Sequence, residues 1–335
     1  MTIRTALKAT VTQLGLKPAL ERVYLESGLL GERLQYLVRD RPEPSEAIVV
    51  AGSARSGSTW LADLVCSVPG IQQIFEPLRE LPRWLPGGAP AYPKTCYLRP
   101  EGRYPDWDHV LSGVLTGRSR TYWTDTARTC FFPRRYLIKD VRVSLMLGYL
   151  HDRFHPRIAY LSRHPCAIVA SRIGLGWRLD LNNLLSQEEL VEDHLSPWLA
   201  RIERARSNPV ATHAIWLAVE NRVASQHLST RPHSHAYYEH LLMEPEATLR
   251  AILSGLDLGT SRVPENRIKR NSRTTWRQRL AKDPKETEYA LSNWKRRLSK
   301  EDQREVLDWA YRLEVTSYSD ESLPVASGQS ATPHR

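Results

Sequence analysis

The stretch AIVVAGSARSGSTWLADLV, residues 47–65, decides the fold of this 335-residue chain. A short apolar run, a glycine-containing turn and a segment of helical periodicity follow one another, as expected of a buried parallel strand that leads through a loop into a helix. Gly52 and Gly57 enclose four residues, the spacing of a phosphate-binding loop, but Ser58 stands where nucleotide kinases and ATPases have a lysine. The sequence therefore predicts a phosphate-bearing ligand that does not need that lysine.

Arg55, inside the loop, is the residue that can replace the missing positive charge. Its planar guanidinium binds a phosphate through two charge-assisted hydrogen bonds. Backbone N–H groups of the loop and the N-terminus of the following helix bind further phosphate oxygens. Ser58 itself offers only a hydroxyl, so we expect Arg55 to neutralise the ligand.

Four further segments have the apolar character of buried strands, and turn or helix signals follow each of them. They are IQQIFEP (71–77), RRYLIKD (134–140), PRIAYLSR (156–163) and the start of SHAYYEHLLMEPEATLRAILSGLDL (234–258). Strands that alternate with helices predict an α/β fold, a parallel β-sheet flanked by helices on both faces. Two long connections, 79–133 and 174–210, are typical of lids or binding loops.

The chain divides into three parts. Residues 1–46 have the pattern of polar amphipathic helices and predict an N-terminal helical arm. Residues 47–313 contain all of the expected strands and predict one α/β domain. Residues 314–335 are rich in small and polar residues and predict a disordered tail.

The net charge of +10 is uneven, because residues 262–300 carry 13 Lys and Arg against 4 Asp and Glu. Charge alone leaves nucleic acid, an anionic membrane and a polyphosphorylated small ligand open. The four cysteines lie far apart, which argues against a zinc site or a disulfide framework. The sequence has no run of 18 apolar residues and no secretory signal, so we expect a cytoplasmic protein without a transmembrane segment.

Two segments make the sequence recognisable. ARSGSTWL (54–61) resembles the 5′-phosphosulfate-binding loop of sulfotransferases that use 3′-phosphoadenosine 5′-phosphosulfate (PAPS), and LSRHPCAIVASR (161–172) resembles their 3′-phosphate-binding segment. The resemblance implies that Arg163 and Ser171 hold the 3′-phosphate. Pro165 marks a helix start, so Arg163 lies at a strand-to-helix junction with Ser171 about two turns along. The residues that the resemblance assigns to the 5′-phosphosulfate are Arg55, Ser56, Gly57, Ser58, Thr59 and Trp60.

A third segment, IKRNSRTTWRQRL (268–280), resembles the C-terminal cofactor loop of the same family. The resemblance implies that Arg270, Ser272 or Arg273 contacts the 3′-phosphate, which gives the basic region a purpose. It also implies a P-loop-type fold and transfer of a sulfuryl group from PAPS to an acceptor hydroxyl. Since a sulfuryl group carries less charge than a phosphoryl group, cations and loop amides suffice for the transfer, and we expect no metal.

Glu76 is the expected catalytic base, acting with Arg55. It ends the second strand, where carbohydrate and tyrosylprotein branches of the family place a glutamate, and the carboxyl ends of parallel strands share one crevice. His151 and His155 are alternative bases. Lys139, at another strand end, either faces the sulfate or forms a salt bridge. The family commonly has aspartate where this chain has His164, which we expect to change one local hydrogen bond.

The tetrapeptide FEPL (75–78) resembles the carbohydrate-type branch of the family. Animal members of that branch are membrane-anchored, and this sequence has no membrane segment, so it resembles a soluble, bacterial-type member. The expected acceptor is therefore a hydroxyl on a carbohydrate or on another small glycosidic or lipid metabolite. Tryptophans in the long connections suit a ring-bearing acceptor, although core packing is the commoner role of a tryptophan. These tryptophans are Trp84, Trp107, Trp123, Trp177 and Trp198.

Three other functions compete with this interpretation. A kinase or NTPase needs a lysine at position 58 and an acid that holds magnesium, for which only Asp140 is suitably placed. A nucleic-acid-binding module would use the basic region, but the sequence lacks the motifs of the common modules. A relative that binds the nucleotide without catalysis stays open. The sequence does not predict an oligomeric state.

Overall fold

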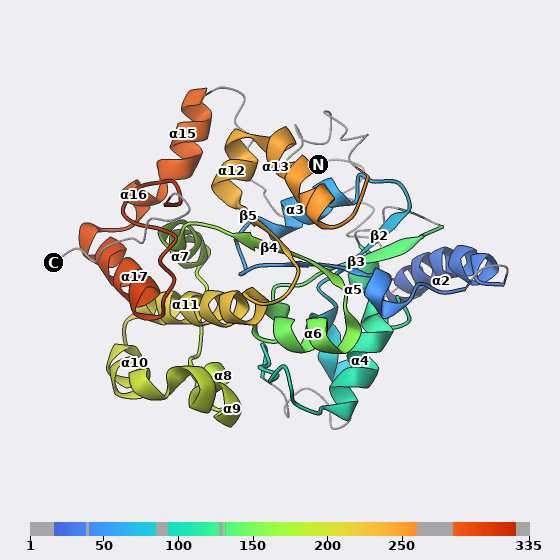
Figure 1. Ribbon diagram of the computed structural model, residues 1–335, viewed down its shortest axis with the longest axis horizontal. Helices are drawn as coiled ribbons and strands as arrows, with labels where there is room; N and C mark the ends of the chain where they lie inside the picture. Colours follow the sequence, from blue (N-terminus) through green and yellow to red (C-terminus); the bar gives the residue numbers. More distant parts are fainter. Residues whose placement is uncertain are drawn as a thin grey trace.

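The computed structural model describes residues 17–37, 40–84, 93–126, 130, 132–259 and 284–325. A five-stranded parallel sheet with the order β2-β3-β1-β4-β5 forms the centre of the described chain (Figure 1). Its strands are β1 (Ile48–Ala51), β2 (Ile71–Phe75), β3 (Arg135–Lys139), β4 (Arg157–Ser162) and β5 (Ser234–Tyr237). Each strand lies inside a segment expected from the sequence, so the predicted α/β fold class is confirmed.

The register brings the carboxyl ends of the strands to one edge of the sheet. Lys139, the last residue of β3, pairs with Val50 of β1 on one side and with Phe75 of β2 on the other. On the other side of β1, Ser162 of β4 pairs with Tyr237 of β5. The segments that follow these strands therefore start beside one another, which is where ligands bind in open parallel sheets.

Helices cover both faces of the sheet (Figure 1). Ile48 and Val50 of β1 pack with residues of α3 (Ser58–Val65), α12 (Tyr238–Met243) and α13 (Pro245–Gly255). Val49 and Ala51 point to the opposite face, because side chains alternate along a strand. There they share a core with α4 (Pro105–Leu115), α6 (Leu147–Phe154) and the end of α11 (Pro209–Leu228).

A helical layer extends the fold beside α7 (Pro165–Gly174). It joins α7, α11 and α17 (Lys300–Arg312) around a fully buried Trp309. The remaining α-helices of the described chain are α2 (Lys17–Gln35), α5 (Tyr122–Asp125), α8 (Asn182–Leu185), α9 (Glu188–Leu190), α10 (Leu199–Ala205), α15 (Pro284–Ser292) and α16 (Trp294–Arg297). The connections 79–133 and 174–210, expected as loops, thus contain helices α4, α5, α8, α9 and α10.

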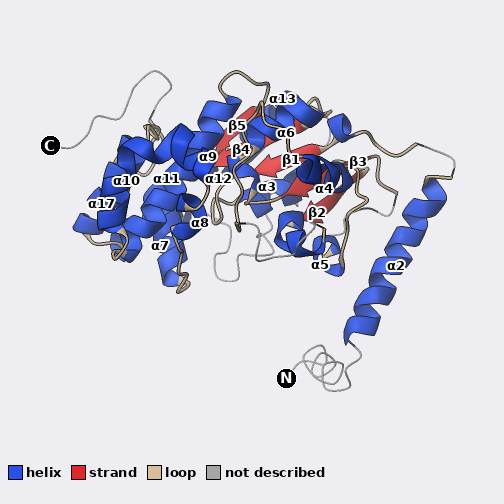
Figure 2. Cartoon of the chain, turned by 90° about the horizontal axis from the view of Figure 1, so that it is seen from below, coloured by secondary structure: helices blue, strands red, loops and turns tan. Residues whose placement is uncertain are grey.

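The first described helix, α2, projects from the body of the molecule (Figure 2). Its C-terminal end is attached by Glu32, which is buried and accepts hydrogen bonds from Arg120 (2.6 Å) and from the Tyr136 hydroxyl (2.9 Å). Within the described residues, no helix combines the length and the apolar character needed to cross a bilayer.

Residues 314–325, expected as part of a disordered tail, pack against the domain instead. Tyr318 is buried, and its hydroxyl donates to Glu239 at 2.8 Å. The Ser319 carbonyl accepts from His164 Nε2 at 3.0 Å. Ordered structure continues past residue 313 because one aromatic side chain and one carbonyl find buried partners, which a composition argument does not reveal.

Candidate active site

The loop between β1 and α3 has the backbone geometry that a bound anion requires. Gly52 has a φ of +147°, and a Cβ there would lie 2.5 Å from the Leu161 carbonyl oxygen. Gly57 has a φ of +98° and is the residue before α3, where a Cβ would lie 2.5 Å from the Tyr238 ring. Arg55 also adopts a positive φ, +78°, which costs an L-residue about 1 to 3 kcal/mol. The two glycines and this strained arginine together shape the loop.

Arg55, Arg163 and Ser171, all three named as candidate site residues from the sequence, lie together at this loop. Arg55 Nε donates to Ser171 Oγ at 3.1 Å, and Arg163 Nη1 donates to the Arg55 carbonyl at 3.0 Å. The Arg163 guanidinium lies 4.1 Å from the centre of the Tyr238 ring. Within the described chain, neither guanidinium pairs with a carboxylate. Burial and then the nearby Arg163 charge lower the pKa of Arg55. Two cations held together without a carboxylate in ion-pair contact form a site for an anion.

Glu76 follows β2 directly and has a φ of +43°. Its backbone N–H donates to the Lys139 carbonyl at 2.7 Å, which extends the pairing of β2 with β3 by one residue. Its Oε1 lies 2.6 Å from Lys139 Nζ, and the two side chains are 17% and 3% exposed. Of the two roles considered for Lys139, the structure shows the salt bridge. The pair fixes the direction of the Glu76 carboxylate.

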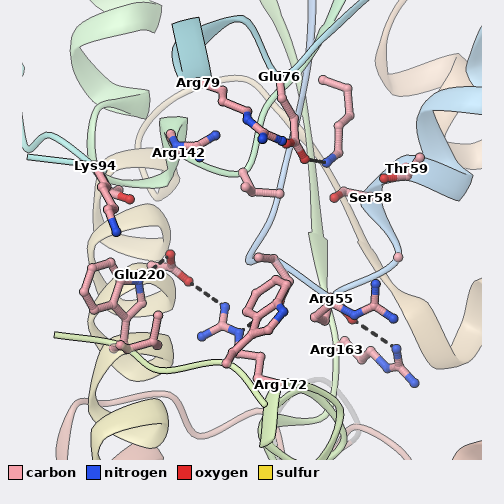
Figure 3. A pocket seen from close by; sticks show the side chains of 18 of the residues that line it. Arg55, Ser58, Thr59, Glu76, Arg79, Lys94, Arg142, Arg163, Arg172 and Glu220 are labelled. Atoms are coloured by element: carbon pink, nitrogen blue, oxygen red, sulfur yellow. Dashed lines mark hydrogen bonds and ion pairs between the residues drawn. The ribbon is translucent and has the colours of Figure 1, made fainter. Parts of the chain in front are cut away.

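A cavity of about 490 Å³ brings the loop and Glu76 together. Figure 3 shows Glu76 on one side, Arg55 and Arg163 on the other, and Ser58 and Thr59 between the two groups. Gly57 and Trp60 also line the cavity. Ser56 does not line it; its hydroxyl is buried and has no hydrogen-bond partner in the described chain. The carboxyl ends of β1, β2, β3 and β4 thus contribute to one pocket.

The tryptophans of the long connections have different positions. Trp123 and Trp177 line the cavity, so they are available to an acceptor. Trp107 is buried in the core, and Trp84 and Trp198 are partly buried and pack against core clusters. Trp216, from α11, also lines the cavity, although no sequence motif pointed to it.

Arg172 and Glu220 were not expected as site residues. Arg172 is 1% exposed, its Nε donates to the Ala54 carbonyl of the loop at 3.2 Å, and its Nη2 lies 3.4 Å from Glu220 Oε2. Glu220 also accepts from Trp216 Nε1 at 2.9 Å. Burial lowers the pKa of Arg172, whereas the Glu220 charge raises it. Arg172 could have been selected from the sequence, because it is the last residue of the segment 161–172. No sequence pattern pointed to Glu220.

His164 caps α7. Its Nδ1 accepts the Cys166 N–H at 3.2 Å, so its proton lies on Nε2 and donates to the Ser319 carbonyl at 3.0 Å. The ring stacks on Trp294, with 4.2 Å between centroids. Burial lowers the pKa of His164 to about 3. The ring is therefore neutral and takes the capping role that suits aspartate at this position.

The other residues considered for catalysis lie elsewhere. His151, in α6, and His155, which follows α6, do not line the cavity; His151 Nδ1 lies 3.0 Å from Asp152. Asp140 is fully buried, and its two oxygens accept backbone N–H groups of Leu78 (2.7 Å) and Arg142 (2.9 Å). These bonds use the Asp140 carboxylate within the fold, which disfavours the magnesium role that a kinase would need.

The three residues expected in the C-terminal cofactor loop, Arg270, Ser272 and Arg273, lie outside the described residues. Their role stays a prediction from sequence.

Comparison with known proteins gives structural likeness at low sequence identity. No protein-family model matches the chain, and no curated protein matches it. A sulfotransferase domain from the curacin biosynthetic pathway is 17% identical, with 82% of this chain and 99% of that chain covered and a TM-score of 0.46. A sulfotransferase domain from the Synechococcus PCC 7002 olefin synthase is 15% identical, with coverages of 82% and 97% and a TM-score of 0.42. A retinol dehydratase solved with androsterone and the inactive cofactor PAP is 14% identical, with coverages of 81% and 81% and a TM-score of 0.33.

Proposed function

We propose that this chain is a PAPS-dependent sulfotransferase that moves a sulfuryl group to an acceptor hydroxyl. The observation that carries the proposal is the junction of Arg55, Arg163 and Ser171, which lies across one cavity from Glu76. Two unpaired cations on one side and a carboxylate on the other suit an anionic donor and a hydroxyl acceptor. The acceptor class that we propose is a carbohydrate or another small glycosidic or lipid metabolite.

The residues of the loop fit a 5′-phosphosulfate. Gly52 and Gly57 let the backbone approach a ligand closely, and Ser58 is the first residue of the eight-residue helix α3, whose N-terminus attracts negative charge. The buried Ser56 hydroxyl has no hydrogen-bond partner in the described chain. In this proposal Arg55 and the segment 56–60 hold the 5′-phosphosulfate.

Arg163 and Ser171 fit a 3′-phosphate on the same nucleotide. Arg163 is fixed by the Arg55 carbonyl and by the Tyr238 ring, and both contacts leave its remaining N–H groups for phosphate oxygens. Ser171 already contacts Arg55, so its hydroxyl joins the two halves of the site. A nucleotide with phosphates at both positions would satisfy both cations, whereas a simple nucleoside triphosphate would satisfy only the loop.

The reaction follows from the position of Glu76. PAPS supplies a sulfuryl group, and adenosine 3′,5′-bisphosphate is the product that leaves. As the acceptor oxygen bonds to sulfur, the bond from sulfur to the 5′-phosphate oxygen breaks, and Glu76 receives the hydroxyl proton. Lys139 orients Glu76 through Oε1, and in this proposal Oε2 receives the proton. Arg55 stabilises the negative charge that develops on the departing phosphate.

The Glu76→Gln variant tests the proposed reaction. Purified protein is incubated with PAPS labelled with ³⁵S and an extract of sugars, glycosides and lipids, and the label that moves to any acceptor is measured. We expect wild-type transfer, a loss of about 10²-fold or more in the variant and unchanged affinity for the bisphosphate. Glu101→Gln, an exposed carboxylate outside the cavity, is the matched control. No transfer by wild-type protein would contradict the proposed reaction, and an equal loss of bisphosphate binding would make Glu76 a structural residue.

A further inference from the structure

The cavity carries more positive charge than the nucleotide needs. Its described lining includes eight Lys and Arg side chains and three carboxylates. Two of the carboxylates are already paired, Glu76 with Lys139 and Glu220 with Arg172. Four cations have no ion pair in the described chain and no part in the proposed nucleotide site. They are Arg79, Lys94, Arg142 and Arg178.

Arg142 is the cation among these whose surroundings point most clearly to a ligand. It follows β3, is half-buried, and its Nη1 is buried without a hydrogen-bond partner in the described chain. The Asp140 charge attracts Arg142, but the two side chains form no ion pair in the described chain, and the Asp140 oxygens accept two backbone N–H groups. A buried donor without an acceptor destabilises the fold unless something else accepts from it. A group with only acceptor atoms, such as a carboxylate, satisfies this requirement.

Arg79 supports the same interpretation from the β2 side. Its guanidinium lies 4.1 Å from the centre of the Trp123 ring, and that ring packs against Phe75 with 5.6 Å between centroids. The aromatic contact restrains Arg79 without removing its charge. Phe75 and Trp123 also line the cavity, so an apolar wall stands beside the cation.

Figure 3 shows that the additional cations do not lie together with the cations of the loop. Arg79 and Arg142 lie on the side of Glu76, Lys94 lies at another edge near Glu220, and Arg55 and Arg163 lie across the cavity at the loop. The cations on the Glu76 side therefore face the space where the proposed reaction places the acceptor, not the nucleotide.

We infer that the acceptor carries an anionic group, a carboxylate, sulfate or phosphate, in addition to its reacting hydroxyl. Arg142 and Arg79 bind this group, Phe75 and Trp123 contact the apolar or ring part of the acceptor, and Glu76 receives the hydroxyl proton. This inference rests on the proposed sulfotransferase function and narrows its acceptor class. It makes Arg142 and Arg79 specificity residues for the acceptor.

The test compares acidic ligands with neutral partners that keep the same ring. Three pairs are titrated by calorimetry into the full chain, with and without saturating adenosine 3′,5′-bisphosphate. They are 4-hydroxyphenylacetate with its amide, glucuronate with glucuronamide, and 4-hydroxyphenyl phosphate with hydroquinone. The proteins are wild type, Arg142→Gln, Arg79→Gln and the control Arg118→Gln, an exposed arginine outside the cavity.

In the bisphosphate-loaded wild type we expect at least one acid to bind about tenfold or more tightly than its neutral partner. Arg142→Gln and Arg79→Gln each remove most of that preference, while Arg118→Gln retains it. The pair that shows the preference tells whether a carboxylate or a phosphate is bound. All four proteins bind the bisphosphate equally.

Three results would overturn the inference. They are no acid preferred over its partner, a preference that survives Arg142→Gln, and a loss of bisphosphate affinity in Arg142→Gln, which would place this arginine in the nucleotide site. The affinity of the wild type for the bisphosphate tests the proposed sulfotransferase function separately from the acidic ligands. Failure of the nucleotide to bind is therefore distinguishable from failure of the acidic ligands.

Discussion

Replacing Arg163 by alanine should remove the preference of the protein for a 3′-phosphate. Arg163 donates one N–H to the Arg55 carbonyl and lies over the Tyr238 ring, so its remaining N–H groups are directed by contacts on two sides. Each charge-assisted hydrogen bond contributes about 1.5 to 3 kcal/mol. Because the side chain is half-buried, we count one such bond after solvent screening, which corresponds to about 10- to 150-fold in affinity.

The assay is a cycle that changes the protein and the ligand separately. Wild type and Arg163→Ala are each titrated with adenosine 3′,5′-bisphosphate and with adenosine 5′-monophosphate at one salt concentration. The ratio of the two affinities should be high in the wild type and should fall about 10- to 150-fold in the variant, while the monophosphate affinity hardly changes. Arg163→Lys, which keeps the charge but loses the planar fork, should give an intermediate ratio.

Two results would refute this reasoning. An unchanged ratio would show that Arg163 does not contact the 3′-phosphate. An equal fall for both ligands would show that Arg163 acts only by supporting the loop through the Arg55 carbonyl. Arg118→Ala, at an exposed position outside the cavity, controls for the loss of one positive charge.

Two further predictions concern the loop and the cap of α7. In Gly57→Ala the new Cβ would lie at a positive φ and 2.5 Å from the Tyr238 ring. We expect weaker bisphosphate binding by calorimetry and a loss of about 1 to 3 kcal/mol in the free energy of unfolding by urea. Wild-type values in both assays would contradict the loop geometry. Burial lowers the pKa of His164 to about 3. The buried neutral ring therefore contributes to the free energy of unfolding above pH 6.5, and this contribution is lost as the pH falls from 6.5 toward 3. We expect the free energy of unfolding to fall by about 2 kcal/mol between pH 7 and 4.5. Urea unfolding at both pH values should show a smaller loss in His164→Asn, and an identical loss would argue against a neutral buried ring.

The sequence predicted the parts of the site that depend on local pattern. The strand before Gly52, the helix after Gly57 and the spacing of Arg163 from Ser171 are all set by residues close in the chain. Arg55 and Ser171 lie 116 residues apart, yet each was identified within its own segment, and the structure joins them at 3.1 Å. Local motifs were sufficient here because the loop after β1 and the start of α7 after β4 both lie at the same edge of the sheet.

The parts that the sequence did not predict depend on strand order and on helix packing. The Glu76–Lys139 ion pair forms because β2 and β3 are neighbours, a pairing that the alternation of strands and helices does not specify. Glu220 is in α11, which is buried over much of its length and therefore lacks a clear polar face. Arg142 is identified as a candidate ligand-binding residue only because its Nη1 is buried without a hydrogen-bond partner in the described chain, which depends on the packed structure.

The most direct test of the central claim is nucleotide binding by the wild-type chain. Adenosine 3′,5′-bisphosphate and ATP with magnesium are titrated separately by calorimetry at moderate salt. We expect the bisphosphate to bind with a dissociation constant on the order of micromolar and ATP to bind far more weakly, because Arg163 and Ser171 have no 3′-phosphate to hold in ATP. Tighter binding of ATP with magnesium would contradict the account and would favour a kinase or NTPase.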